Sequence, residues 1–137
     1  MPHQIIRAGD GWDARFAAGL SVTGIRLELH FQLHIGPGGV EVYSPGELMT
    51  DDDIYHVHAW SRANLGRVAE LLGLVVRQIY AADSGELTIR FTNDWELLIP
   101  VSHETLGWSV YLYGSRLRSL PGGGVRADLG GGPSAAG

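Results

Sequence analysis

The stretch 24-GIRLELHFQLHIGPGGVEVY-43 decides the fold class, because apolar and polar residues alternate along it. Its apolar positions are Ile25, Leu27, Leu29, Phe31, Leu33 and Ile35, and the polar residues between them are Arg26, Glu28, His30, Gln32 and His34. An alternation with a period of two predicts one half-buried strand over 25–35. Residues 36–39, Gly-Pro-Gly-Gly, predict a turn because Pro fixes φ and Gly accepts positive φ. Alternation resumes at 40–42, so the unit is predicted to be a β-hairpin.

The second half of the chain shows the same pattern. Strands are predicted at 74–80, 86–92, 95–101, 108–113 and 116–120. Leu87, Ile89 and Phe91 are expected to face inward, and Asn93-Asp94 predicts a tight turn into the next strand. The segments FQLHI-GPGG-VEV and LTIRF-TNDW-ELLI resemble each other, as two hairpins would.

Between these halves, apolar residues recur at helical spacing. They are Leu65, Val68, Leu71 and Leu72. The spacing predicts one helix at about 60–72, with Ser61 as its N-cap and Gly73 as its stop. The predicted fold is therefore α+β: a mainly antiparallel sheet of two hairpins plus a C-terminal meander, with one helix packed on it. We expect an N-terminal segment at 1–23, a single α+β domain at 24–128 and a disordered Gly-rich tail at 129–137.

Composition excludes several functional classes. The chain has 137 residues, a net charge of −5 and no cysteine. Disulfides and thiolate metal sites are excluded, and the absence of cysteine fits a cytoplasmic protein. The negative charge disfavours nucleic-acid binding, which needs a basic face, and favours a basic partner. No apolar run is long enough to span a bilayer, and no signal peptide is recognisable at the N-terminus, so no membrane association is expected.

Residues 24–127 resemble a family of small, uncharacterised and mostly actinobacterial proteins of unknown function. The resemblance rests on a first hairpin, on 71-LLGLVV-76, on 85-GELTIRF-91, on Trp108 and on the turn 121-PGG-123. This sequence departs from the family at the turns, with Gly36–Gly39 and Asn93-Asp94 where acidic-Gly pairs are usual. The resemblance implies a fold, and it brings no known catalytic residue.

Histidines are the first candidates for chemistry. His30 and His34 would lie on one strand face about 13 Å apart, too far for one metal, so this row is predicted to be the solvated side of a sheet. His56 and His58 form an H-x-H pair that could bind zinc if the segment were a strand, but the two rings would diverge on a helix. His103 starts an incomplete H-E-x-x-H pattern, in which Gly107 occupies the second ligand position.

No catalytic motif is present, so we predict no catalytic residue, no metal site and no cofactor. The acidic run Asp51, Asp52 and Asp53 is interpreted either as capping and solvation or as a patch for a basic partner. Tyr111 and Tyr113 alternate with Trp108, Val110 and Leu112, so they are expected to face outward, where tyrosine favours binding interfaces.

Two functions from different classes remain open. The first is a non-catalytic protein-binding module, with an immunity-type protein that neutralises a toxin as its narrower form. It would bind through Asp51, Asp52, Asp53, Tyr111 and Tyr113. The alternative is a small enzyme or a metal- or ligand-binding protein that uses His56, His58 or His103 in a cleft. A homodimer formed through an exposed strand edge is a further structural hypothesis.

Overall fold

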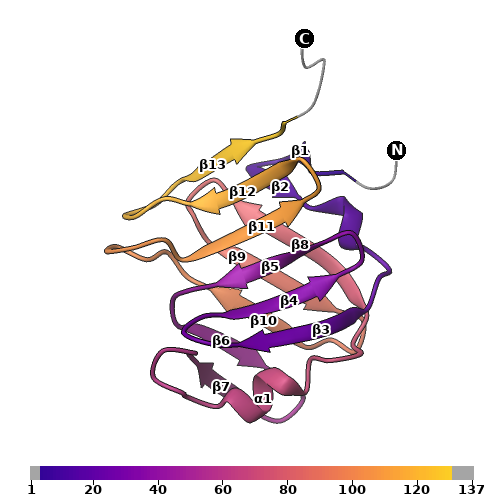
Figure 1. The fold of residues 1–137 in the computed structure, drawn as a ribbon, viewed down its shortest axis with the longest axis vertical. Helices are drawn as coiled ribbons and strands as arrows, with labels where there is room; N and C mark the ends of the chain where they lie inside the picture. Colours follow the sequence, from indigo (N-terminus) through magenta and orange to yellow (C-terminus); the bar gives the residue numbers. More distant parts are fainter. Residues whose placement is uncertain (1–3, 131–137) are drawn as a thin grey trace.

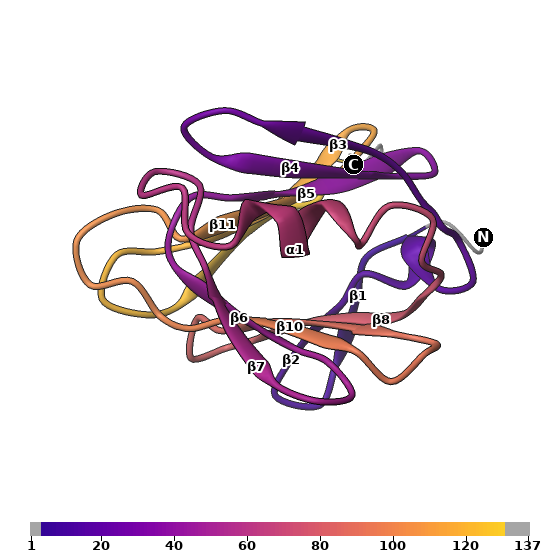
Figure 2. The ribbon, with the colours of Figure 1, turned by 90° about the horizontal axis from the view of Figure 1, so that it is seen from below.

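The computed structural model describes residues 4–130, which form two antiparallel sheets packed face to face (Figures 1 and 2). The first sheet has seven strands in the order β1-β2-β8-β9-β10-β6-β7. Their bounds are Ile6–Ala8 (β1), Gly11–Asp13 (β2), Val76–Ala82 (β8), Leu87–Phe91 (β9), Glu96–Ile99 (β10), Gly46–Met49 (β6) and Ile54–Val57 (β7). This architecture is a β-sandwich.

The second sheet has six strands in the order β13-β12-β11-β5-β4-β3. Their bounds are Val125–Asp128 (β13), Ser115–Ser119 (β12), Trp108–Leu112 (β11), Gly38–Val42 (β5), Phe31–Ile35 (β4) and Val22–Leu27 (β3). A 3-10 helix, η1, spans Arg15–Ala17, and an α-helix, α1, spans Leu65–Ala69. Helix α1 lies at the end of the sandwich where the edge strands β3 and β7 are found (Figures 1 and 2).

The hydrophobic core lies between the two sheets, and both sheets contribute to it. The largest fully buried side chains include Trp108, Phe16, Phe31, Phe91, Leu33 and Leu97. The indole of Trp108 also satisfies its only polar atom, because Nε1 donates a hydrogen bond of 2.8 Å to the Gly85 carbonyl oxygen. Burial of these side chains, which come from both sheets and from η1, stabilises the sandwich.

The two predicted hairpins are confirmed. Strands β4 and β5 pair with Ile35 opposite Gly38, and Gly36 takes a φ of 53° in the turn between them. Strands β9 and β10 pair around the predicted Asn93-Asp94 turn, where Asp94 has a φ of 71°. Leu87, Ile89 and Phe91 are fully buried, as the alternation predicts.

The single strand predicted over 25–35 is wrong, because this stretch folds back on itself as β3 and β4. Leu27 lies opposite Phe31, and residues 28–30 form the turn, which leaves Leu29 67% exposed. Residues opposite each other share a face, and 27 and 31 differ by an even number. A three-residue turn therefore preserves the alternation, so the pattern does not distinguish a straight strand from this hairpin.

The predicted helix at about 60–72 is also wrong in length, and the fold is predominantly β rather than α+β. Helix α1 is five residues long, and its N-terminal neighbour Asn64 is left-handed at a φ of 53°. His58 and Ala63 form an isolated bridge that holds residues 58–63 in a turn, so the helix starts later. Ser61 does not act as a cap, since its hydroxyl lies 3.3 Å from His58 Nδ1.

Three strand regions were not predicted as such. Strands β6 and β7 form a hairpin in a segment where the sequence left strand and helix open at His56 and His58, and β13 extends the C-terminal meander. Strand β2 pairs with β8, so part of the predicted N-terminal segment belongs to the seven-stranded sheet. The boundaries at 23 and 128 stay predictions, and residues 131–137 of the expected tail lie outside the described residues. Within 4–130, no helix is long and apolar enough to cross a membrane.

Candidate functional site

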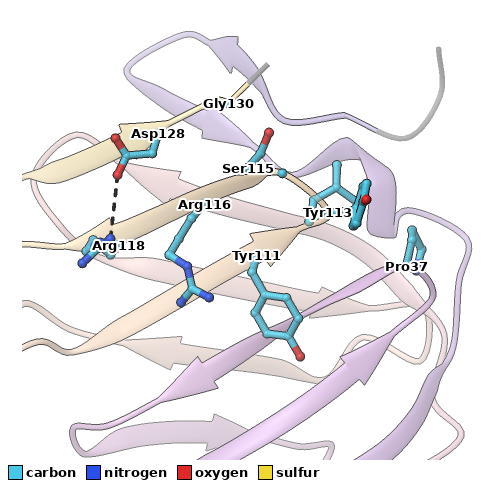
Figure 3. Close-up of a pocket in the computed structure, with 10 residues that line it drawn as sticks. Pro37, Tyr111, Tyr113, Ser115, Arg116, Arg118, Asp128 and Gly130 are labelled. Atoms are coloured by element: carbon cyan, nitrogen blue, oxygen red, sulfur yellow. Dashed lines mark ion pairs between the residues drawn. The ribbon is translucent and has the colours of Figure 1, made fainter. Parts of the chain in front are cut away.

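The outer face of the six-stranded sheet carries a groove at β11, β12 and the turn between them (Figure 3). Its volume is about 600 Å³. Side chains that define it are Pro37, Tyr111, Tyr113, Arg116, Arg118 and Asp128, and we call it the tyrosine groove. The alternation of β12 places these arginines outward, because Leu117 between them is fully buried.

Tyr111 is fixed on this face by its neighbours. Its hydroxyl accepts a hydrogen bond of 2.6 Å from Gln32 Nε2 on β4. To reach Gln32, the ring crosses β5 at Gly39, where a Cβ atom would lie only 2.6 Å from the Tyr111 hydroxyl oxygen. The Arg116 guanidinium lies 5.6 Å from the ring centroid, within cation–π range. Gly39 is therefore required for this position of the tyrosine ring.

A polar network continues from Arg116 across the sheet. Arg116 Nη1 donates a hydrogen bond of 2.7 Å to Ser109 Oγ and lies 3.3 Å from Glu41 Oε1. Tyr43 donates to the same Glu41 oxygen at 2.7 Å, and its ring centroid lies 4.6 Å from that of His30. Burial, together with the Glu41 carboxylate, raises the pKa of Tyr43 to about 12. Glu41 therefore holds two donors, and this part of the face is preorganised.

Tyr113 differs from Tyr111 because it has little support. It follows β11 directly and is 94% exposed. Pro37, from the β4–β5 turn, lines the groove beside it (Figure 3). A large aromatic side chain thus stands next to a fixed one, over a concave polar surface.

A second cavity, of about 390 Å³, lies where the chain passes between the sheets. Residues 43–45 lead from β5 to β6, and residues 102–105 belong to the connection from β10 to β11. The cavity is lined by Tyr43, Ser44, His58, Ser102, His103 and Glu104, together with Pro45 and Thr105, and we call it the histidine cavity. It brings together two of the three histidines named in the enzyme or ligand hypothesis.

The acidic run and the tyrosines belong to different sheets. Asp51, Asp52 and Asp53 form the turn between β6 and β7 in the seven-stranded sheet. Each carboxylate already accepts a hydrogen bond. Asp51 Oδ1 accepts one of 3.0 Å from Trp95 Nε1, a residue distant in sequence. Asp52 Oδ1 accepts one of 2.8 Å from Thr50 Oγ1, and Asp53 Oδ1 accepts one of 2.8 Å from the Ile54 amide. The run therefore shapes a hairpin turn rather than capping a helix.

His56 lies on the edge strand β7, so the condition that the segment is a strand is met for that residue. It does not line the histidine cavity. Residues 4–130 contain no group of three or more His, Cys, Asp or Glu side chains that could hold a metal ion. Among the residues that the structure describes, the H-x-H pair therefore finds no additional ligands of the kind that a zinc site needs.

The sequence-based search missed Arg116 and Arg118. The signal was present as 115-SRLRS-119, in which arginines alternate with Leu117. Alternation of this kind on a strand places both arginines on one face. On the predicted strand at 116–120, the alternation that directs Tyr111 and Tyr113 outward therefore also directs Arg116 and Arg118 outward.

Comparison with known proteins identifies a family and no function. A model described as "Family of unknown function (DUF6188)" matches residues 15–127. No curated protein and no solved structure matches the chain. The match covers most of the chain, including strands β11 and β12 of the tyrosine groove, and it ends one residue before Asp128. The chain therefore belongs to the DUF6188 family of unknown function.

Proposed function

We propose that this protein is a non-catalytic protein-binding module whose binding surface is the tyrosine groove. The observation that carries the proposal is Tyr113, which is 94% exposed beside the fixed ring of Tyr111. Tyrosine combines a large contact area with a polar tip and is enriched at binding hot spots. An exposed tyrosine over a concave surface is typical of such a site.

Preorganisation supports the same proposal. Association costs free energy for every side chain that becomes ordered in the complex. Tyr111 is already held by Gln32, and Arg116 is already held by Ser109 and Glu41. A partner that contacts these groups would order few side chains beyond Tyr113, so more of the interaction energy would appear as affinity.

The test is affinity capture of the tagged protein from its native cells, with mass spectrometry of the proteins that co-purify. The variant Tyr113→Ala should lose the partner, because truncation of a hot-spot tyrosine weakens binding by about tenfold or more. The matched control is Trp60→Ala, since Trp60 is also an exposed aromatic residue, at 66%, but does not line the groove. A partner that is retained equally by both variants would overturn the proposal.

Narrower forms of this function concern the partner and its setting. An immunity-type role would make the partner a toxin, and the net charge of −5 supports a basic one. The Asp51–Asp53 turn would then supply a second contact on the other sheet. Substituting all three residues should weaken the complex without unfolding the domain. The absence of cysteine supports a cytoplasmic setting.

A second candidate function is binding of a small molecule in the histidine cavity. It is favoured by one observation, that His58, His103 and Glu104 line the same cavity. These groups can donate, accept and exchange protons near neutral pH, which a small enzyme would also need. A thermal-shift screen of metabolites should find ligands whose stabilisation is lost in both His58→Ala and His103→Ala. Stabilisation that survives both substitutions would remove this candidate.

A further inference from the structure

Two arginines at the rim of the tyrosine groove form an unfavourable charge pairing. Arg118 on β12 lies directly opposite Arg126 on the edge strand β13. Both side chains face outward, because Leu117, Val125 and Ala127 point toward the core. Like charges at directly opposed positions of a sheet destabilise it. The pairing of Arg118 with Arg126 therefore disfavours folding.

The protein neutralises this pair with a single carboxylate. Asp128 Oδ2 lies 3.8 Å from Arg118 Nη2 and 3.4 Å from Arg126 Nε. One oxygen atom thus serves two guanidinium groups at distances longer than a good hydrogen bond. Figure 3 shows Asp128 facing Arg118 across the end of the groove.

Arg118 is also short of hydrogen-bond acceptors. Its Nε atom is buried, and none of its side-chain nitrogen atoms makes a hydrogen bond to any residue in 4–130. Arg116, two residues earlier on the same face, has both Ser109 and Glu41 as partners. The contrast within one strand shows that this face satisfies one arginine and leaves the next one without an acceptor.

Charge at this end of the face is correspondingly unbalanced. Three arginines, at positions 116, 118 and 126, face two carboxylates, at positions 41 and 128. Arg118 and Arg126 retain exposed side chains, at 43% and 64%, so a ligand can reach their terminal nitrogens. The planar, forked guanidinium binds a carboxylate through two parallel hydrogen bonds.

We propose that Arg118 and Arg126 bind a carboxylate from an acidic segment of a partner protein, next to the aromatic contact at Tyr113. The proposal rests on the binding-module function and specifies its partner's chemistry. A protein segment is favoured over nucleic acid, because the site offers two arginines beside an exposed tyrosine in an acidic chain, whereas a phosphate backbone needs an extended basic face. The acidic segment would contact this groove even where the rest of the partner is basic.

The test is a binding titration of the purified full chain, followed by fluorescence anisotropy. The probe is a labelled synthetic peptide of alternating Glu and Ser, and the matched probe carries Gln in place of Glu. A labelled single-stranded oligonucleotide is the third probe. The variants are Arg118→Met and Arg126→Met, and the control is Arg90→Met, which removes an arginine from the outer face of the other sheet.

We expect the Glu peptide to bind and the Gln peptide to bind at least about tenfold more weakly. Arg118→Met and Arg126→Met should each weaken Glu-peptide binding by about tenfold, and Arg90→Met should leave it unchanged. Melting curves of each variant establish that it is folded. Equal binding of the two peptides, equal affinity of the Arg118 and Arg90 variants, or tighter binding of the oligonucleotide would overturn the inference.

Failure of this inference is distinguishable from failure of the proposed function. If Tyr113→Ala loses the native partner and Arg118→Met retains it fully, the groove is a binding surface whose partner does not use a carboxylate there. That result overturns the acidic-segment proposal alone. If Tyr113→Ala also retains the partner, both proposals are wrong.

Discussion

Two arginines, Arg90 and Arg118, lie on the outer faces of different sheets and have opposite settings. On the seven-stranded sheet, Arg90 on β9 lies opposite Glu96 on β10, and the two side chains form an ion pair of 3.3 Å. On the six-stranded sheet, Arg118 lies opposite Arg126. The first pairing is what sheet stability favours, and the second is what it disfavours. We infer from this difference that the outer face of the six-stranded sheet carries a constraint other than folding.

The two outer faces also share a structural feature. Each face has a tyrosine that crosses a glycine on the neighbouring strand. Tyr111 crosses Gly39, and Tyr80 crosses Gly11, where a Cβ atom would lie 2.8 Å from the Tyr80 ring. Tyr80 uses its hydroxyl to donate to the Ala8 carbonyl oxygen at 2.9 Å. The glycine–tyrosine contact is therefore a structural device of both sheets, and the charge pairing is what differs.

The largest expected effect is a loss of stability that affects both faces together, because the two sheets share one core. Trp108→Ala should lower the free energy of unfolding by about 3–5 kcal/mol, through loss of a fully buried indole and the resulting cavity. Chemical denaturation measures this change. Trp60→Ala, at an exposed position, should change stability by less than about 0.5 kcal/mol. A cost below about 1 kcal/mol for Trp108→Ala would contradict the sandwich core described above.

Glycine substitutions should affect the stability of the two faces alike and their binding differently. A Cβ at Gly39 or at Gly11 would lie 2.3 Å from a backbone oxygen of the adjacent strand, so the backbone must shift. Gly39→Ala and Gly11→Ala should each destabilise the protein by about 1–3 kcal/mol. Gly39→Ala should also weaken binding of the Glu peptide, because it displaces Tyr111. If Gly11→Ala weakened that binding equally, the two faces would not differ as proposed.

Removal of an arginine should have opposite signs on the two faces. Arg118→Met removes a like-charge contact and an unsatisfied buried Nε, so stability should stay unchanged or rise by about 0.5–1 kcal/mol. Arg90→Met breaks an exposed ion pair and should cost less than about 1 kcal/mol. Urea unfolding of the two variants at the same ionic strength measures both signs. Clear destabilisation by Arg118→Met would mean that Arg118 is there for the fold.

The smallest expected effect is a change in stability that appears only at alkaline pH. The pKa of Tyr43 is raised from 10.0 to about 12, mainly by burial and then by Glu41. Below pH 10 Tyr43 is protonated in both states. Between 10 and 12 the unfolded chain loses this proton while the folded protein keeps it, so stability falls as pH rises. Denaturant titrations across this range should show a smaller fall for Tyr43→Phe, and identical slopes would contradict the assignment.

Prediction from sequence succeeded where a local pattern and the tertiary structure impose the same constraint. The hairpins β4–β5 and β9–β10 combine alternation with turn residues that accept positive φ, so each part indicates the same structure. The prediction of β3 failed because a three-residue turn preserves alternation. Leu65 and Val68 face the interior, as the helical spacing predicts. The predicted helix is nevertheless too long, because the turn at 58–63 leaves room for one short helix only.

The candidate site was predictable in part for a similar reason. The outward direction of Tyr111 and Tyr113 follows from the period of the strand. The pairing of Arg118 with Arg126 depends on the register between β12 and β13, and β13 was not predicted. The acidic turn at 51–53 was visible in the sequence, but its position on the other sheet depends on the β6–β7 hairpin. Register and sheet membership depend on contacts between residues far apart in the sequence, which the period of the apolar–polar alternation does not specify.

The measurement that tests the central claim most directly is the affinity of the purified native partner for the wild type, Tyr113→Ala and Trp60→Ala. Isothermal titration of the full-length proteins gives all three dissociation constants. If the tyrosine groove is the binding surface, Tyr113→Ala binds about tenfold or more weakly than the wild type, and Trp60→Ala binds as tightly as the wild type. Equal affinity of the wild type and Tyr113→Ala would contradict the claim that this face binds the partner.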